Sequence, residues 1–141
     1  MLNIEKITND YTDRIMSIIN EFDNENVEQM FTSRNIGKNQ LDILLKAVRS
    51  ANSVDEIILF ISYQKSKSKD NESWKYKVGG KTFADFLIEK LKKVIDLALN
   101  EEICKKLTDN SEEELRILKL KFCEKFLGYF YWKGSVLMNN N

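Results

Sequence analysis

Apolar residues recur along this chain at intervals of three and four positions, the spacing that places them on one face of an α-helix. The first such run predicts a helix over residues 3–22 with six apolar positions: Ile4, Ile7, Tyr11, Ile15, Ile18 and Phe22. A second run predicts a helix over residues 39–50, which carries charged residues on its other side. Alternation typical of β-strands is hard to find, and proline is absent. The pattern therefore predicts an all-α protein.

A capping box marks the start of the next predicted helix. In the sequence S-V-D-E, the Ser53 oxygen can accept a hydrogen bond from the backbone N–H three residues on, while Glu56 reaches back. The helix then runs to about residue 65. Its apolar residues are largely β-branched, so a strand is the alternative interpretation of this segment. The cap and the length of the run favour the helix.

The C-terminal part of the chain predicts three further helical segments. Thr82 caps a helix over residues 83–99, residues 101–107 form a short helical piece, and a second capping box starts the last helix, over residues 112–133. No internal repeat or low-complexity linker divides the chain. We therefore expect one domain, residues 1–141, folded as a single compact bundle of about five helices.

The last predicted helix is rich in aromatic residues. One apolar stripe contains Leu115, Leu118, Phe122, Phe126 and either Tyr129 or Phe130. Tyr131 and Trp132 fall off that stripe. Core packing accounts for most of these residues, but aromatic side chains on more than one side of a terminal helix indicate a partner surface.

Charge is distributed unevenly, although 22 basic and 22 acidic residues cancel over the whole chain. An acidic N-terminal part, residues 1–30, has two basic and seven acidic residues, a net charge of −5. A basic midsection, residues 31–81, has ten basic and five acidic residues, a net charge of +5. The C-terminal helices, residues 82–134, follow. Segregated charge of this kind is typical of a subunit that contacts RNA with one surface and protein with another.

The basic midsection contains the candidate binding residues. Between residues 62 and 81, six lysines accompany two acidic residues, with Trp74 and Tyr76 among them. Lysine neutralises phosphate and an interleaved aromatic ring can stack on a base, the combination that single-stranded nucleic acid requires. The predicted RNA-binding residues are Arg34, Lys38, Lys46, Arg49, Gln64, Lys65, Lys67, Lys69, Trp74, Lys75 and Lys77. The alternative is a solvated loop anchored by one tryptophan.

Residues that carry catalysis are scarce. Histidine is absent, which removes the commonest general base and a common metal ligand. The G-G-K-T sequence at residues 79–82 resembles the end of a phosphate-binding loop, but lysine occupies the position of its first glycine. The carboxylates are dispersed, and those of residues 112–114 stand at a helix start, where they interact with the helix dipole. We therefore expect no catalytic site, no metal and no cofactor.

Location can also be predicted. Cys104 and Cys123 each lie in an amphipathic stretch without metal-ligand spacing, which predicts two packed, reduced cysteines rather than a disulfide. No stretch approaches the length of uncharged apolar residues needed to span a membrane. The first ten residues have no basic or apolar region typical of a secretory signal. The sequence therefore predicts a cytoplasmic protein with no membrane contact.

Four stretches share an order of features with a known family. They are a leucine-rich basic helix, N-Q-L-D-I-L-L-K-A-V-R; an apolar helix ending in tyrosine and then a basic residue, S-V-D-E-I-I-L-F-I-S-Y-Q-K-S-K; a helix with paired phenylalanines, G-K-T-F-A-D-F-L-I-E-K-L; and an aromatic closing helix, F-C-E-K-F-L-G-Y-F-Y-W-K-G. Together they span roughly residues 39 to 134, and their order resembles the small subunits of type III CRISPR effector complexes. Where that family has an arginine after the tyrosine-ended helix, this chain has three lysines, Lys65, Lys67 and Lys69.

The resemblance implies a non-catalytic RNA-binding subunit. Copies would associate head to tail along a duplex of guide RNA and target RNA, in contact with other subunits of the complex. The alternative is a helical protein-interaction adaptor or regulator, such as a phage or plasmid accessory protein, with no nucleic acid partner. A small enzyme that uses carboxylates alone is a third possibility.

Overall fold

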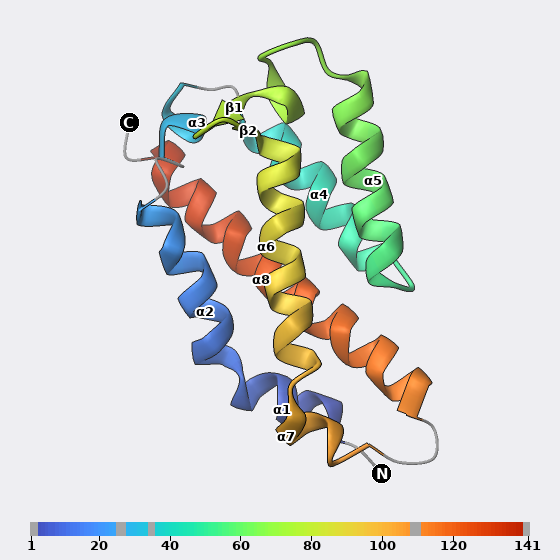
Figure 1. The fold of residues 1–141 in the computed structure, drawn as a ribbon. Helices are drawn as coiled ribbons and strands as arrows, with labels where there is room; N and C mark the ends of the chain where they lie inside the picture. Colours follow the sequence, from blue (N-terminus) through green and yellow to red (C-terminus); the bar gives the residue numbers. More distant parts are fainter. Residues whose placement is uncertain (1–2, 25–27, 34–35, 108–110, 140–141) are drawn as a thin grey trace.

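The computed structural model describes residues 3–24, 28–33, 36–107 and 111–139, and most of them are helical. The helices are α1 Ile4–Asp10, α2 Thr12–Asn20, α3 Glu28–Thr32, α4 Lys38–Ser50, α5 Val54–Lys67, α6 Phe83–Ala98, α7 Glu101–Cys104 and α8 Ser111–Asn139 (Figure 1). Short 3-10 turns occupy Glu21–Asn24 (η1) and Ser73–Lys75 (η2). The predicted all-α class is confirmed.

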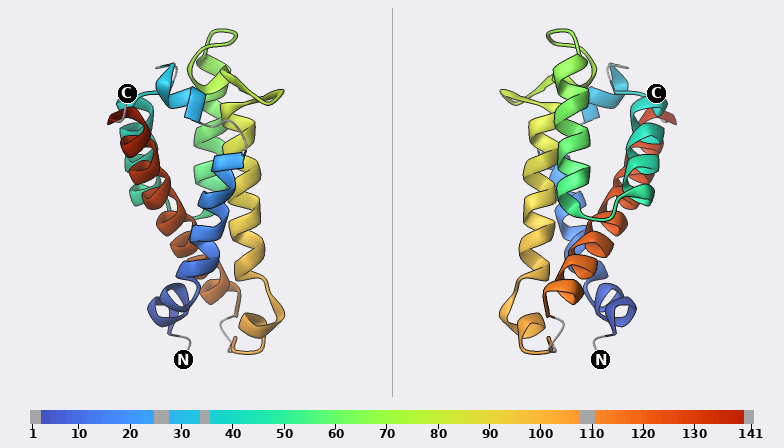
Figure 2. Two further views of the ribbon diagram at one scale, coloured as in Figure 1. Left: turned by 90° about the vertical axis from the view of Figure 1, so that its left-hand side faces the viewer. Right: turned by 90° about the vertical axis from the view of Figure 1, so that its right-hand side faces the viewer.

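The long helix α8 is the central element of the bundle. It contacts α1, α2, α3, α4, α5 and α6, and Figures 1 and 2 show it crossing the molecule obliquely, with α4 beside its C-terminal half. Six of its buried positions follow one another at steps of four: Glu114, Leu118, Phe122, Phe126, Phe130 and Gly134. Cys123 and Leu127 are buried next to this series. Four residues turn an α-helix by about 40° more than a full circle. The buried stripe therefore winds around α8, and the two ends of the helix bury different faces.

Phenylalanine rings fill the core around α8. The Phe22 ring meets those of Phe86, Phe126 and Phe130 edge to face, with centroids 5.2 to 6.2 Å apart. The Phe83 ring stacks on Phe130 at 6.0 Å. Such edge-to-face and offset pairs add to the stability that burial alone supplies. These contacts join η1, α6 and α8 in one continuous hydrophobic core.

The first predicted helix is interrupted. Residues 3–22 form α1, α2 and η1, with Tyr11 between α1 and α2 at φ −98° and ψ 6°. The Tyr11 hydroxyl accepts a hydrogen bond from Asn100 Nδ2 at 2.8 Å and donates one to Glu102 Oε2 at 3.2 Å. The turn places the Tyr11 ring inside the bundle, where these two distant residues hold it.

The segment that begins at Ser53 is the helix α5, so its alternative interpretation as a strand was wrong. Ser53 Oγ accepts a hydrogen bond from the Glu56 N–H at 3.4 Å, and the Glu56 carboxylate accepts one from the Asn52 N–H at 3.1 Å. The Ser53 side chain caps the helix as predicted. Glu56 binds the backbone N–H of Asn52, whereas a standard capping box would use the N–H of Ser53. The last helix also extends to Asn139, beyond the predicted end at residue 133.

A small hairpin closes the lysine-rich loop and was not predicted. Strands β1 Lys77–Val78 and β2 Lys81–Thr82 pair antiparallel. Gly79 and Gly80 form its turn with φ values of 56° and 87°, which glycine adopts without strain. The hairpin leads directly into α6, where the Thr82 side chain caps the helix by accepting a hydrogen bond from the Asp85 N–H at 3.1 Å.

The two cysteines have different surroundings. Cys123 is buried in the core, and that burial raises the pKa of its thiol to about 12. Cys104 is exposed, so the expectation that both cysteines are packed was wrong for this one. Both are free thiols, as predicted. In addition, no helix within the described part of the chain has the length and apolar character needed to cross a membrane.

Candidate nucleic-acid interface

Helix α4 presents three cations on its outward side. Its buried positions, Leu41, Leu44 and Val48, hold the opposite side against the core. Lys38, Lys46 and Arg49 are exposed, and we call these three residues the α4 face. Their spacing of eight and three places them on one side of the helix. Within the described part of the chain, none of the three forms an ion pair.

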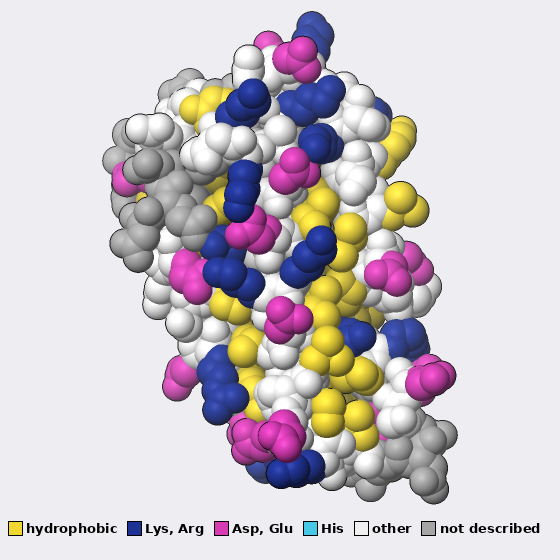
Figure 3. Space-filling model, viewed as in Figure 1, with side chains coloured by type: hydrophobic (Ala, Val, Ile, Leu, Met, Phe, Trp, Pro, Cys, Tyr) yellow, Lys and Arg dark blue, Asp and Glu magenta, His cyan; other side chains and the backbone are white. Residues whose placement is uncertain are grey.

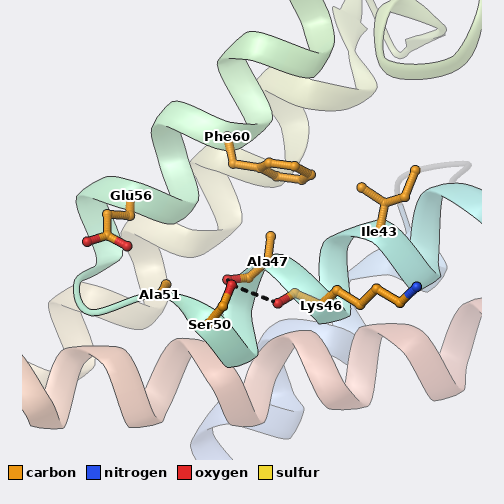
Figure 4. A pocket seen from close by; sticks show the side chains of 7 residues that line it. All are labelled: Ile43, Lys46, Ala47, Ser50, Ala51, Glu56 and Phe60. Carbon is orange, nitrogen blue, oxygen red and sulfur yellow. Dashed lines mark hydrogen bonds between the residues drawn. The ribbon is translucent and has the colours of Figure 1, made fainter.

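A first groove lies between α4 and α5. It has a volume of about 420 Å³ and is lined by Ile43, Lys46, Ala47, Ser50, Ala51, Glu56 and Phe60 (Figure 4). Figure 4 shows the Phe60 ring projecting from α5 toward α4, while the Lys46 ammonium extends away from Glu56. The α4/α5 groove is therefore mainly apolar, with a cation at its edge.

A second groove lies on the other side of α4, against α8. It has a volume of about 360 Å³ and is lined by Asp42, Leu45, Lys46, Arg49, Gly128, Tyr131 and Trp132. Trp132 is 66% exposed, the largest aromatic ring on the described surface. A hydrogen bond with Asp42 and the negative charge of that carboxylate raise the pKa of the Tyr131 hydroxyl. The α4/α8 groove thus combines aromatic rings with both charges.

A third groove extends the basic surface toward the lysine-rich loop. Its volume is about 300 Å³, and it brings Gln64, Lys67 and Lys69 beside Asn39 at the start of α4. The Lys67 ammonium also lies 4.7 Å from the centre of the Tyr63 ring. The structure therefore places these three predicted residues beside the first turns of α4.

Other predicted residues point elsewhere or are already paired. Lys65 donates to both carboxylate oxygens of Asp85 at 3.0 Å, which directs it toward α6. Lys75 lies 3.9 Å from the Asp70 carboxylate. Lys77 is exposed on the hairpin. Arg34 lies outside the described residues.

The prediction that Trp74 stacks on RNA bases was wrong. Its side chain is only 3% exposed, and its ring lies 5.3 Å from that of Phe83 and 6.3 Å from that of Phe60. Burying an indole in the core is more favourable than leaving it in water, so the ring anchors η2 to α5 and α6. For Trp74, the alternative interpretation of the sequence, a loop anchored by one tryptophan, is the one that fits the structure.

The aromatic residues that do accompany the cations are Tyr131 and Trp132. Both were expected on a partner surface but were not assigned to RNA. They come from a helix more than 80 residues further along the chain than Lys46, and only the packing of α8 against α4 brings them together. Their position off the apolar stripe was the available sequence signal.

The two carboxylates that share a face of α6 are each bound by a lysine. Asp85 pairs with Lys65, and Glu89 pairs with Lys81, which lowers the pKa of Glu89 through a hydrogen bond. Among the residues that the structure describes, no three or more Asp, Glu, Cys or His side chains lie close enough together to hold a metal ion.

Comparisons of the chain with protein-family models, curated proteins and solved structures gave no match.

Proposed function

We propose that this chain is a non-catalytic, cytoplasmic RNA-binding small subunit of a type III CRISPR effector complex. The observation that carries the RNA-binding part is the α4 face. Among the described residues its cations have no carboxylate partners, and Lys46 lies between two grooves that contain aromatic rings. Three of the four stretches that resemble the family form α4, α5 and α8, the helices around this surface. The proposed ligands are the guide RNA and the target RNA, which pair in a duplex and are single-stranded outside it.

The chemistry of the surface suits a phosphate backbone. Lysine and arginine that bind phosphates release the counterions condensed on the nucleic acid, so binding weakens steeply with salt. From Lys38 to Arg49 the α4 face extends about 16 Å along the helix axis, enough to contact several phosphates of one strand. Lys67 and Lys69 continue the surface beyond the start of α4. A phosphate can bind such a cation without first breaking an ion pair to a carboxylate.

Reversing two charges on the α4 face tests this proposal. We expect Lys46→Glu combined with Arg49→Glu to weaken binding of a single-stranded RNA at least tenfold at low salt. In a plot of the logarithm of the binding constant against the logarithm of the salt concentration, the slope should become shallower by about 1.4. Each lost phosphate contact on a single strand reduces the slope by about 0.7, and two contacts are lost. Fluorescence anisotropy over a salt series measures both quantities. The RNA should also remain intact with magnesium present, as a non-catalytic subunit requires.

A matched control separates position from net charge. Lys92 and Lys106 are both exposed but lie away from α4, on α6 and after α7. Lys92→Glu combined with Lys106→Glu changes the net charge by the same amount and should bind RNA nearly as well as the parent. Equal losses in the two double variants, or parent protein that binds no RNA at low salt, would contradict the proposal.

Association between copies is the second part of the proposed function. Several acidic residues belong to the elements at the end of the bundle opposite the lysine-rich loop (Figure 1): Glu5, Asp10, Asp13, Glu101, Glu102, Glu112 and Glu113. Of these, Asp10, Glu101 and Glu113 pair with Lys6, Lys105 and Arg116 at the same end. An acidic end and a basic end on one molecule allow a head-to-tail contact that repeats. Such a contact suits a subunit present in several adjacent copies.

Head-to-tail association should be weak without RNA. Exposed ion pairs contribute roughly 0–1 kcal/mol each, so we expect the free protein to sediment as a monomer at physiological salt. Addition of a long RNA should produce assemblies that dissociate as salt is raised. An oligomer of the protein alone that survives high salt would show that another surface holds the copies together.

One observation favours the adaptor alternative. Hydrophobic side chains form a band along one side of α6 (Figure 3), beside a groove of about 350 Å³ that includes Val54, Ile95 and Leu115. An apolar band of this kind is typical of a protein-binding surface. An adaptor would bind its partner nearly independently of salt, in contrast to the RNA binding proposed here.

A further inference from the structure

The α4/α8 groove has a more specific composition than the rest of the proposed interface. One wall, α8, carries an exposed indole, and the other, α4, carries two cations and a single carboxylate. Each of these groups recognises a different chemical feature of a ligand. Their combination limits what the groove can hold.

The indole of Trp132 is free to stack. It lies off the buried stripe of α8, and the nearest aromatic ring is that of Tyr129, with centroids 5.9 Å apart. Side chains on a helix lean toward its N-terminus, so Trp132 lies over the turn that contains Gly128. A Cβ atom at Gly128 would have no neighbour within 4 Å. The groove therefore has open space at Gly128, beside an exposed aromatic ring.

The charges define where an anion can lie. Lys46 and Arg49 face the groove from α4 without carboxylate partners of their own among the described residues. Asp42, also on α4, interacts with the Tyr131 hydroxyl across the groove. A phosphate would be attracted to the two cations and repelled by Asp42, which favours N–H or O–H donors instead. A ligand that fits has an anionic part and a flat part with hydrogen-bond donors.

We propose that the α4/α8 groove binds one unstacked base of a single-stranded RNA segment, with the base on Trp132 and the flanking phosphates on Lys46 and Arg49. This inference rests on the proposed function and names the part of the RNA that the groove recognises. Every base has an aromatic face and at least one donor on its edge, so the site is tolerant of sequence. Asp42 then orients the base by accepting from its edge or from the ribose 2′-hydroxyl.

Tryptophan fluorescence gives a direct test, because the protein has two tryptophans in contrasting positions. Trp74 is buried in the core, whereas Trp132 is exposed. We expect a short oligouridine to quench the emission of Trp132, isolated by subtracting the signal of the Trp132→Phe variant. Trp132→Ala should weaken RNA binding roughly five- to 150-fold, the range expected for loss of one base–aromatic stack. Trp132→Phe should retain most of the affinity.

Val136 supplies a matched control. It is 56% exposed and lies one turn further along α8, outside the groove. Val136→Ala removes exposed apolar surface from the same helix and should leave RNA binding unchanged. Unfolding curves of the variants should match the parent, because neither residue belongs to the core.

The outcomes distinguish this inference from the proposed function. If RNA binding is lost in the Lys46→Glu, Arg49→Glu variant but Trp132→Ala binds normally and Trp132 is not quenched, the inference is wrong and the proposed function stands. If Trp132→Ala leaves RNA binding intact but abolishes association between copies, the groove holds a protein segment, which also overturns the inference. If the parent binds no RNA, both fail.

Discussion

Replacing Gly134 with valine is expected to lower the free energy of unfolding by about 2–3 kcal/mol. Gly134 is buried where α8 passes α3 and α4, and a Cβ atom there would lie 2.7 Å from Phe31 Cε1 and 2.9 Å from Leu41 Cδ1. Both neighbours are themselves buried, so neither can swing aside into solvent. The helices must move apart to accept the larger side chain. Urea denaturation followed by circular dichroism measures the change.

A second glycine on the same helix should give the opposite sign. Gly128 lies in the interior of α8, and no atom stands within 4 Å of the position its Cβ would take. Gly128→Ala should therefore stabilise the protein by about 0.5–1 kcal/mol, because alanine restricts the unfolded chain and suits a helix. If Gly134→Val unfolds at the same urea concentration as the parent, the close approach of α8 to α3 and α4 is wrong.

Features with local causes could be predicted from the sequence. The capping serine and threonine at residues 53 and 82 each accept a hydrogen bond from an N–H three residues on, so the starts of α5 and α6 depend only on neighbouring residues. Apolar spacing likewise placed α4 to within one residue. The break at Tyr11 could not be predicted in this way. Its hydroxyl is bound by Asn100 and Glu102, which lie about ninety residues further along the chain.

The candidate site was predictable only in part, for the same reason. The apolar stripe of α4 left Lys46 and Arg49 on its outer side, and the structure confirms their exposure. Trp74 was misplaced because a ring among lysines suggests a surface, whereas its contacts with Phe60 and Phe83 are tertiary. The winding stripe of α8 decides which aromatic residues face α4. The sequence prediction assumed one buried face along the whole of α8, so it could not show that the buried face changes from one end of the helix to the other.

Residue Lys90 shows how far tertiary packing can depart from a sequence pattern. It is 1% exposed, although lysine is almost never fully buried. Its ammonium lies 3.2 Å from a carboxylate oxygen of Glu21, which also accepts from Lys93 at 3.0 Å. Burial alone would raise the pKa of Glu21, but the hydrogen bonds and charges of Lys93 and Lys90 outweigh it and lower that pKa. Folding therefore favours the ionised carboxylate.

Replacing Glu21 with glutamine should destabilise the protein at neutral pH by about 1–3 kcal/mol, less than for a fully buried pair because the Glu21 side chain is 39% exposed. Since the folded pKa lies below the ordinary value of 4.5, the stabilisation is complete above that pH and is lost as pH falls through the folded pKa. Unfolding free energies measured from neutral to acid pH should fall less steeply for Glu21→Gln than for the parent.

Glu89→Gln is the matched control, because Glu89 also has a lowered pKa but pairs with the exposed Lys81. That variant should lose less than 1 kcal/mol at neutral pH. Equal losses in the two variants would show that the burial of Lys90 adds nothing to the importance of its partner.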